Sequence, residues 1–554
     1  MPGLIKYSTS NTSGTLRKGN TVIGMGEVPE SVAANMAPSI DVPPDGYVVY
    51  TIGLNNTPKM WAVTRGVDLL PIAKTLGGSS KTVEDAIYYI CSLTDAWILD
   101  NPINDIVDDG LALYLNTENL SSYPGVNTSF MDISGGGING TLYNGPVFNS
   151  NGFLEFDGVD DYAIIGSAND IQFGTGDFTI EALFKPIDDG GGWTGVVAKG
   201  ASGATGFAMN YYANGNGTVT LRMSITAPSN QHYSSGHLTS DKWYHIVMVF
   251  DRDTAGYVYN NGDLTYSHTA LTSNNQTVDN SGYPLRLSTF GGGSWFLNGA
   301  ISKVKLYNRT LSESEVLQNF HQGPIVTNGL IFAADAGNLV SYQSGSANAN
   351  SLIGSLEGDV VNSPTFNSNN KGFWEFDGTD DRINFSSTQI LSDLGVTSGD
   401  DNDVAYSIEA WIRVKSYPNG VGSSGDSIIG FNDEHGIGLQ VFGNGSRAYF
   451  NFGYRSNNNY DSGDISLNTW YHVVATRDTG GGSGNYKIYI NNVKNRDAYG
   501  DLRVNYTTAD MGIGNSPSRI GPFNGDIALT RIYNKALTQA DVSQNWNAQK
   551  NRFI

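Results

Sequence analysis

The chain has 554 residues, too many for a single hydrophobic core, with 39% hydrophobic and only 15% charged residues. Its 68 glycines and 30 tyrosines favour short strands joined by tight turns, so we expect a mainly β protein. The net charge is −21, and the 32 Lys and Arg residues form no basic stripe. This disfavours nucleic acid as a partner.

Export and membrane signals are missing from the sequence. The first residues contain no apolar stretch of signal-peptide length, and no run approaches the ~20 apolar residues that span a bilayer. The single cysteine, Cys91, excludes an intrachain disulfide. We therefore expect a protein made in a cytoplasm, without a signal peptide and without membrane insertion.

Residues 1–106 differ in pattern from the rest of the chain. Residues 47–54 alternate between apolar and polar, which predicts a strand. Residues 81–100 place apolar side chains, Cys91 among them, near one face of a helix. The pattern predicts a small α+β domain, and either attachment or oligomerisation would suit it.

The rest of the chain is an internal duplication, with predicted domains at 107–323 and 324–554. Four blocks occur twice in the same order, with pairs 148–162 and 366–382, 177–186 and 405–414, 241–262 and 468–492, and 296–320 and 523–546. Their apolar residues alternate with period two, and each copy ends in a short helix with a capping pattern. We therefore expect two tandem β-sandwiches.

The repeated blocks resemble a known family, the laminin-G-like, concanavalin A-like jelly rolls. The resemblance rests on the F-D-G-x-D-D turn, the I-E-A strand, the W-Y-H strand and the closing N-G-x-I…Y-N block of each copy. It implies two jelly rolls, and it leaves function open, because this superfamily contains lectins, adhesion modules and glycosidases. The N-terminal part, more faintly, resembles the head of a tailed-phage (cyanophage-like) virion structural protein.

Catalysis is not expected. Glycosidases of this superfamily often carry E-x-D-x-x-E on one strand, which sets two carboxylates on the same side. The nearest matches, residues 155–160 and 375–380, end in Asp and contain a D-G turn where the strand should continue. We therefore expect a protein that is not an enzyme.

Calcium is the one expected cofactor, because the F-D-G-x-D-D turn gathers carboxylates and calcium takes six to eight oxygens. The alternative is that these Asp residues cap their own turn and need no metal. The predicted ligands are Asp157, Asp160, Asp161, Asp377, Asp380, Asp381 and Asp526.

Sugar binding would need exposed aromatic rings in loops, although any one of these residues could instead fill the sandwich. The candidates are Trp193, Tyr211, Tyr212, Tyr233, Trp295, Tyr454 and Tyr460. Trp243 and Trp470 recur at equivalent strand positions, which predicts core residues. The equivalent pair His245 and His472 is predicted to be structural.

Together these patterns predict a non-catalytic virion structural protein, a fibre or surface-displayed adhesion protein. Its jelly rolls would bind host-surface glycans, and its N-terminal domain would bind other virion proteins, with homo-oligomerisation expected. The alternatives are a capsid decoration or head-fibre protein whose sandwiches mainly pack against neighbours, and a bacterial adhesin or carbohydrate-binding protein.

Overall fold

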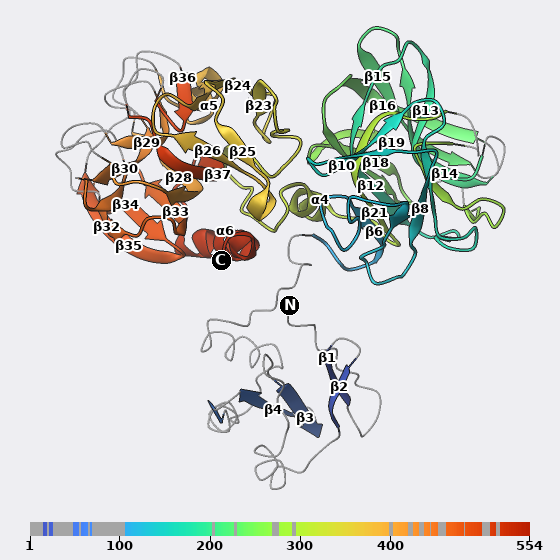
Figure 1. Ribbon diagram of the computed structural model, residues 1–554, viewed down its shortest axis with the longest axis horizontal. Helices are drawn as coiled ribbons and strands as arrows, with labels where there is room; N and C mark the ends of the chain where they lie inside the picture. The colour runs from blue at the N-terminus through green and yellow to red at the C-terminus, as the bar shows by residue number, and fades with distance from the viewer. Residues whose placement is uncertain are drawn as a thin grey trace. The chain divides into compact units, whose positions relative to one another are not determined.

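The computed structural model forms two compact units, Met1–Pro102 and Ile103–Ile554 (Figure 1). In the first unit it describes five strands. In the second it describes residues 106–201, 205–226, 230–268, 276–290, 295–397, 403–418, 425–431, 437–443, 445–452, 461–480, 482–500, 510–516 and 521–554. No helix among these residues is long and apolar enough to cross a membrane.

The strands of the first unit belong to two small antiparallel sheets. One pairs β1 (Thr15–Lys18) with β2 (Thr21–Met25), and the other has the order β3 (Val48–Leu54), β4 (Thr57–Thr64) and β5 (Val67–Asp68). The strand predicted at residues 47–54 is confirmed as β3. The helix predicted at 81–100, with Cys91, lies outside the described residues.

The first repeat is a sandwich of two eight-stranded antiparallel sheets. One sheet has the order β19 (Asp263–His268), β18 (Gly256–Asn260), β17 (Tyr244–Phe250), β12 (Phe178–Pro186), β21 (Asn298–Tyr307), β10 (Phe153–Asp157) and β9 (Val147–Asn149), with β6 (Leu111–Asn116) also paired to β21. The other has the order β16 (Asn230–Thr239), β15 (Thr218–Thr226), β14 (Gly206–Ala213), β13 (Gly192–Lys199), β20 (Leu285–Leu287), β11 (Tyr162–Ile165), β8 (Gly140–Tyr143) and β7 (Ser129–Phe130).

The second repeat has the same two sheets. One has the order β25 (Thr365–Asn367), β26 (Phe373–Asp377), β37 (Asn524–Tyr533), β28 (Tyr406–Val414), β33 (Trp470–Arg477), β34 (Gly482–Ile490) and β35 (Val493–Gly500), with β22 (Leu330–Asp335) paired to β37. The other has the order β23 (Asn348–Asn350), β24 (Glu357–Val361), β27 (Arg382–Ser386), β36 (Asp510–Ile513), β29 (Asp426–Phe431), β30 (Gly438–Gly443), β31 (Ala448–Phe452) and β32 (Asp461–Ile465).

The expected duplication of one sandwich is therefore confirmed. Alternate side chains of both sheets fill a separate apolar core in each repeat. Helix α4 (Glu313–Phe320) closes the first repeat, and α6 (Gln539–Gln549), followed by η4 (Lys550–Arg552), closes the second. Both closing helices begin with the predicted capping box, at Ser312 and Thr538. The second repeat also contains α5 (Thr388–Asp393) and η3 (Asn369–Lys371).

A buried carboxylate joins the closing helix to the sheet in the first repeat. Glu181 on β12 accepts hydrogen bonds from His245 Nε2 on β17 (2.9 Å), Lys305 Nζ on β21 (2.5 Å) and Asn319 Nδ2 on α4 (2.6 Å). The Asn319 side-chain oxygen in turn accepts the backbone N–H of Val107 (2.8 Å), just before the first strand of the repeat. One carboxylate thus links three strands, a helix and the start of the domain.

The second repeat contains the same network. Glu409 accepts hydrogen bonds from His472 Nε2 (2.9 Å), Arg531 Nη1 (2.8 Å) and Asn545 Nδ2 (2.6 Å), and Asn545 accepts the N–H of Val326 (2.7 Å). Both histidines are buried, so the structural role predicted for them is confirmed. An unpaired charge at such a depth would be costly, and removing one partner of a buried pair typically costs about 3–5 kcal/mol.

Acid should unfold the second repeat through Glu409. Burial alone would raise its pKa, but the charge of Arg531 and the hydrogen bonds from His472 and Asn545 outweigh burial and lower the pKa to about 2. The native carboxyl therefore holds its proton less tightly than the unfolded one. Its stabilising effect is complete above the unfolded pKa of ~4.3 and is lost as the pH falls toward 2.

The Glu409→Gln variant should lose about 3–5 kcal/mol of unfolding free energy at pH 7 and show a weaker pH dependence between about 4.5 and 2. Urea unfolding followed by tryptophan fluorescence across this pH range measures both effects. The control is Asp464→Asn, an exposed acid on β32, which should behave like the wild type. An unchanged acid sensitivity in Glu409→Gln would contradict this role.

Candidate ligand-binding site

The F-D-G-x-D-D turn of the first repeat brings its three aspartates together. Asp157, Asp160 and Asp161 each offer a carboxylate oxygen within 4.8 Å of the others. Two of these carboxylates also accept hydrogen bonds from the backbone of the turn. Asp157 Oδ1 accepts the N–H of Val159 (2.8 Å), and Asp161 Oδ2 accepts the N–H of Asp157 (3.1 Å). The turn is therefore held by its own hydrogen bonds and also has the carboxylates for a cation.

The second repeat repeats this arrangement with Asp377, Asp380 and Asp381, which again lie within 4.8 Å of one another. Asp526, the seventh predicted ligand, belongs to neither trio. It is buried, and its carboxylate is paired with Arg413 Nε (2.6 Å) and Lys415 Nζ (2.6 Å). The prediction added Asp526 from the closing block of the second repeat, whereas two cations, one on β28 and one just beyond it, already neutralise its charge.

The first repeat has a hollow where the second has this ion pair. Ala300 stands in the register position of Asp526, since Glu155 and Lys185 both pair with Ala300 as Glu375 and Arg413 pair with Asp526. The hollow has a volume of about 280 Å³ and is lined by Val147, Glu155, Phe156, Asp157, Asp161, Lys185, Ile187, Asn298, Gly299 and Ala300. In the second repeat, Lys415 bridges Glu375 and Asp526 instead.

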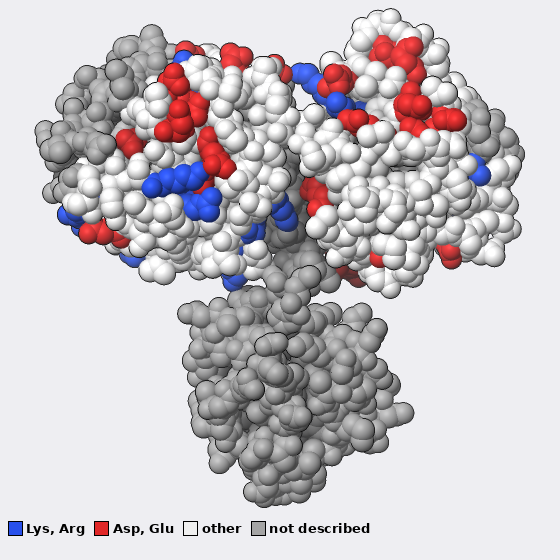
Figure 2. All heavy atoms as spheres, viewed as in Figure 1, with Lys and Arg blue, Asp and Glu red and all other residues white. Residues whose placement is uncertain are grey.

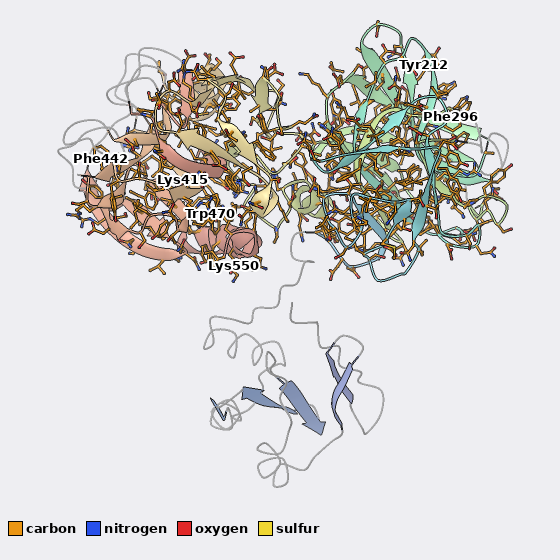
Figure 3. All side chains as sticks on the ribbon, in the orientation of Figure 1. Tyr212, Phe296, Lys415, Phe442, Trp470 and Lys550 are labelled. Atoms are coloured by element: carbon orange, nitrogen blue, oxygen red, sulfur yellow. The ribbon has the colours of Figure 1, made fainter. Side chains whose placement is uncertain are left out.

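Among the described residues, charged side chains are sparse on the face shown in Figure 2. The basic group of the second repeat lies among acidic side chains, where Figure 3 labels Lys415. Among the described residues on this face, no continuous basic stripe is seen, as the composition led us to expect.

Three of the predicted aromatic residues meet on the outer face of the sheet that begins with β16. The ring centroid of Trp193 lies 4.9 Å from that of Tyr212 and 6.2 Å from that of Trp295. The guanidinium of Arg222 lies 3.4 Å from the Trp193 ring centroid. Tyr212 is 38% exposed and is labelled in Figure 3. Because Arg222 covers one face of Trp193, Tyr212 is the ring most open to a ligand.

The aromatic cluster is built from two strands and one loop. Trp193 on β13 and Tyr212 on β14 are register partners, and Arg222 lies on the next strand, β15. The loop between β20 and β21 adds Trp295, whose carbonyl accepts the N–H of Gly195 (3.0 Å). Gly195 is required there, because a Cβ would lie 2.6 Å from the backbone of Thr289. The backbone of the loop between β20 and β21 therefore packs directly against the backbone of β13.

The prediction that Tyr211 and Tyr233 stack on a sugar was wrong. Tyr211 is fully buried, because it precedes Tyr212 on β14 and so points to the opposite face, into the core. Tyr233 is also buried, with its ring 4.3 Å from that of His268. Neither ring has a free face for a sugar. Tyr454 and Tyr460 lie outside the described residues.

A second aromatic group on the same sheet was missed by the sequence reasoning. The rings of Tyr143 on β8 and Tyr162 on β11 stack at 5.0 Å, and Phe296 lies 6.3 Å from Tyr162. Phe296 follows Trp295 directly, so one loop contributes to both groups. The signal that could have found them is their outward position in strands whose neighbouring residues are buried.

In the described part of the second repeat, no exposed ring stands at the positions equivalent to Trp193 and Tyr212. By register, Phe442 replaces Tyr212 and Gly425 replaces Trp193. Phe442 is buried and covers Gly425, where a Cβ would lie 2.6 Å from the phenylalanine ring. The two repeats thus share a fold but differ on this face.

Three solved structures have a weak similarity to this chain. The binding domain of Paraclostridial Mosquitocidal Protein 1 is 13% identical, with coverage of 69% of this chain and 91% of that one and a TM-score of 0.33. Domain 4 of AbnA, a GH43 extracellular arabinanase from Geobacillus stearothermophilus, in complex with arabinotriose, is 19% identical (39% and 96%, TM-score 0.26). A Trypanosoma rangeli sialidase mutant displaying trans-sialidase activity is 12% identical (77% and 83%, TM-score 0.32). At these TM-scores, none bears on function.

Comparison with curated proteins gives no match. The family model Laminin_G_3, described as the concanavalin A-like lectin/glucanases superfamily, matches residues 157–317 and again residues 377–543. The two matches span more than half of the chain and coincide with the two sandwiches, each from the end of its F-D-G strand into its closing helix. The chain therefore belongs to the concanavalin A-like lectin/glucanases superfamily, as a tandem pair of Laminin_G_3 domains.

Proposed function

We propose that the chain is a non-catalytic binding protein whose first repeat binds a glycan on the outer face of the sheet β16–β7. The observation that carries the proposal is the cluster of Trp193, Tyr212 and Trp295 around Arg222. A sugar ring has an apolar C–H face and a rim of hydroxyls. An exposed aromatic ring beside a few polar groups suits both.

Polar side chains border the aromatic cluster on neighbouring strands. The Arg222 guanidinium has five N–H donors, and Thr220 and His237, 3.0 Å apart, lie at the next outward position along β15 and β16. Sugar hydroxyls can accept hydrogen bonds from Arg222, and they can both donate to and accept from Thr220 and His237. The acidic chain disfavours a strongly anionic ligand, so a neutral glycan is the class that we propose.

Several contacts support a non-catalytic role. Glu375 is held by Lys415 Nζ (2.7 Å) and Asn367 Nδ2 (2.7 Å), and the interaction with Lys415 is the main cause of its lowered pKa. A general acid needs the opposite, a raised pKa. In the first repeat, Asp157 caps its own turn, and its pKa is lowered chiefly by the N–H of Val159.

The place of action stays a prediction. We propose a virion, with the N-terminal domain bound to other virion proteins and the repeats displayed to host-surface glycans as part of a homo-oligomer. Antibodies against residues 1–106 and against the repeats should label purified virions, with the repeats outermost. Unlabelled virions would contradict this placement and favour a bacterial adhesin.

The glycan proposal is tested by exposing the full chain to an array of neutral glycans and measuring the best ligand by calorimetry. The Tyr212→Ala variant should bind that ligand at least about tenfold more weakly, equal to a loss of about 1.4 kcal/mol. Tyr266→Ala is the matched control, because Tyr266 lies on the other sheet and is similarly exposed, at 36%.

Two results would overturn the glycan proposal. One is the absence of any bound glycan, and the other is equal affinity in Tyr212→Ala and wild type. An equal loss in Tyr266→Ala would show that the effect is not specific to the aromatic cluster. Release of reducing ends from the bound glycan would overturn the non-catalytic part.

Calcium at the aspartate trios also stays a prediction. With one oxygen from each carboxylate, a trio supplies at most half of the usual calcium shell, and second carboxylate oxygens, backbone oxygens or water would supply the rest. Asp160 and Asp380 are the members to change, since among the described residues no hydrogen bond is accepted by their carboxylates. Calcium, but not magnesium, should raise the melting temperature of wild type, and the Asp160→Asn/Asp380→Asn variant should lose this rise. A melting temperature that calcium leaves unchanged would contradict the prediction.

A further inference from the structure

The two repeats share a turn that lies in different surroundings. Residues 119–123 and 338–342 follow the first strand of each repeat, and both read N-L-x-S-Y. The backbone hydrogen bonds are the same, with Ser122 N–H donating to Asn119 O (2.8 Å) and Ser341 N–H to Asn338 O (2.8 Å). We call this segment the NL turn.

In the second repeat the NL turn is buried. Leu339 and Val340, 9% and 7% exposed, belong to one apolar cluster with Phe153, Leu183 and Trp243 of the first repeat. These three residues define what we call the docking face of the first repeat. Trp243 Nε1 also donates to Gln343 Oε1 (2.9 Å). The NL turn of one repeat therefore docks on the outer face of another.

In the first repeat the same turn is uncovered. Leu120, the equivalent of Leu339, is 74% exposed. Met131 is also exposed, and its N–H donates to Ser122 O (2.7 Å), which places it against the turn. Exposed apolar side chains gathered in this way are typical of an interaction surface.

The docking face of the second repeat is closed by the chain itself. Its residues Phe373, Trp411 and Trp470 are equivalent to Phe153, Leu183 and Trp243 by strand position. The ring of Phe553 lies 4.3 Å from that of Trp411 and 4.9 Å from that of Trp470.

The C-terminal segment is also anchored by polar contacts. Arg552 donates to Asp335 Oδ2 (2.8 Å), Asn370 O (2.6 Å) and Gly372 O (2.7 Å). Figure 3 labels Trp470 and Lys550 in this part of the second repeat. Phe553 therefore takes the place on the second repeat that Leu339 and Val340 take on the first.

We propose that a second copy of this chain is the partner of these surfaces: the NL turn of one first repeat docks on the docking face of another chain's second repeat, and Phe553 competes for that face. The argument is continuity with the contact that already joins the two repeats, since both surfaces recur and only their occupants differ. Such a contact is head to tail, so it extends into a ring or a filament once the C-terminal segment is displaced.

The experiment compares full-length wild type with Arg552→Ala/Phe553→Ala by sedimentation equilibrium and tryptophan fluorescence. At concentrations low enough to keep it monomeric, the variant should show red-shifted tryptophan emission, because the docking face is then exposed. Its weight-average mass should rise with concentration to at least about twice that of wild type. Deletion of residues 550–554 should do the same. Adding Leu120→Glu should return the mass to the wild-type value.

The matched control is Leu264→Glu, another exposed leucine (49%) on β19, which should leave the association intact. A wild-type mass at every concentration despite red-shifted emission would overturn the proposal. An association that Leu120→Glu leaves unchanged would also overturn the proposal, since the contact between chains would then not involve the NL turn. Unshifted emission of the monomeric double variant and of the monomeric deletion variant would overturn the role of Phe553.

Discussion

The buried carboxylates of Glu181 and Glu409 are the constraint on which the architecture of each repeat depends. Each lies in the middle strand of a sheet, where an ion is tolerated only if its charge and its acceptor sites are fully used. The cation of the last strand, the histidine of the neighbouring strand and the asparagine of the closing helix meet this demand. The carboxylate thereby specifies where the helix sits on the sheet.

The hydrogen-bond network around each buried carboxylate also fixes where each repeat begins. The same asparagine that bonds the carboxylate holds the backbone at Val107 or Val326, so the first strand begins at a fixed place beside the last. With both ends of the repeat set by one network, the loops and outward faces are free to change. The two copies use this freedom: the first carries an aromatic cluster, whereas Phe442 closes the equivalent surface in the second.

The fold was accessible from sequence because its signals are local and occur twice. Period-two alternation gives the strands, and the four ordered blocks give the duplication. The network around Glu181 was missed, although a signal was present: an acidic residue recurs in the middle of an apolar strand as Glu181 and Glu409. Its partners lie more than 60 residues away, so only the fold shows that they meet.

The candidate site was only partly accessible, and the reasons are physical. Tyr211 and Tyr212 are adjacent and chemically identical, yet one is buried and the other exposed, because the register of the strand decides which side faces the core. Trp243 and Trp470 are buried as predicted, but both lie outside the sandwich cores. Trp243 packs against the second repeat, and Trp470 packs against Phe553. Sequence patterns report burial without naming what covers the residue.

The central claim is that divergence of the two outward faces has made the first repeat the ligand-binding one. A crystal structure of the chain with its best glycan from the array tests this most directly. The sugar should lie against Tyr212, beside Trp193 and Trp295, and the surface around Phe442 should hold none. A sugar bound on the second repeat, or only at the aspartate turns, would contradict the account.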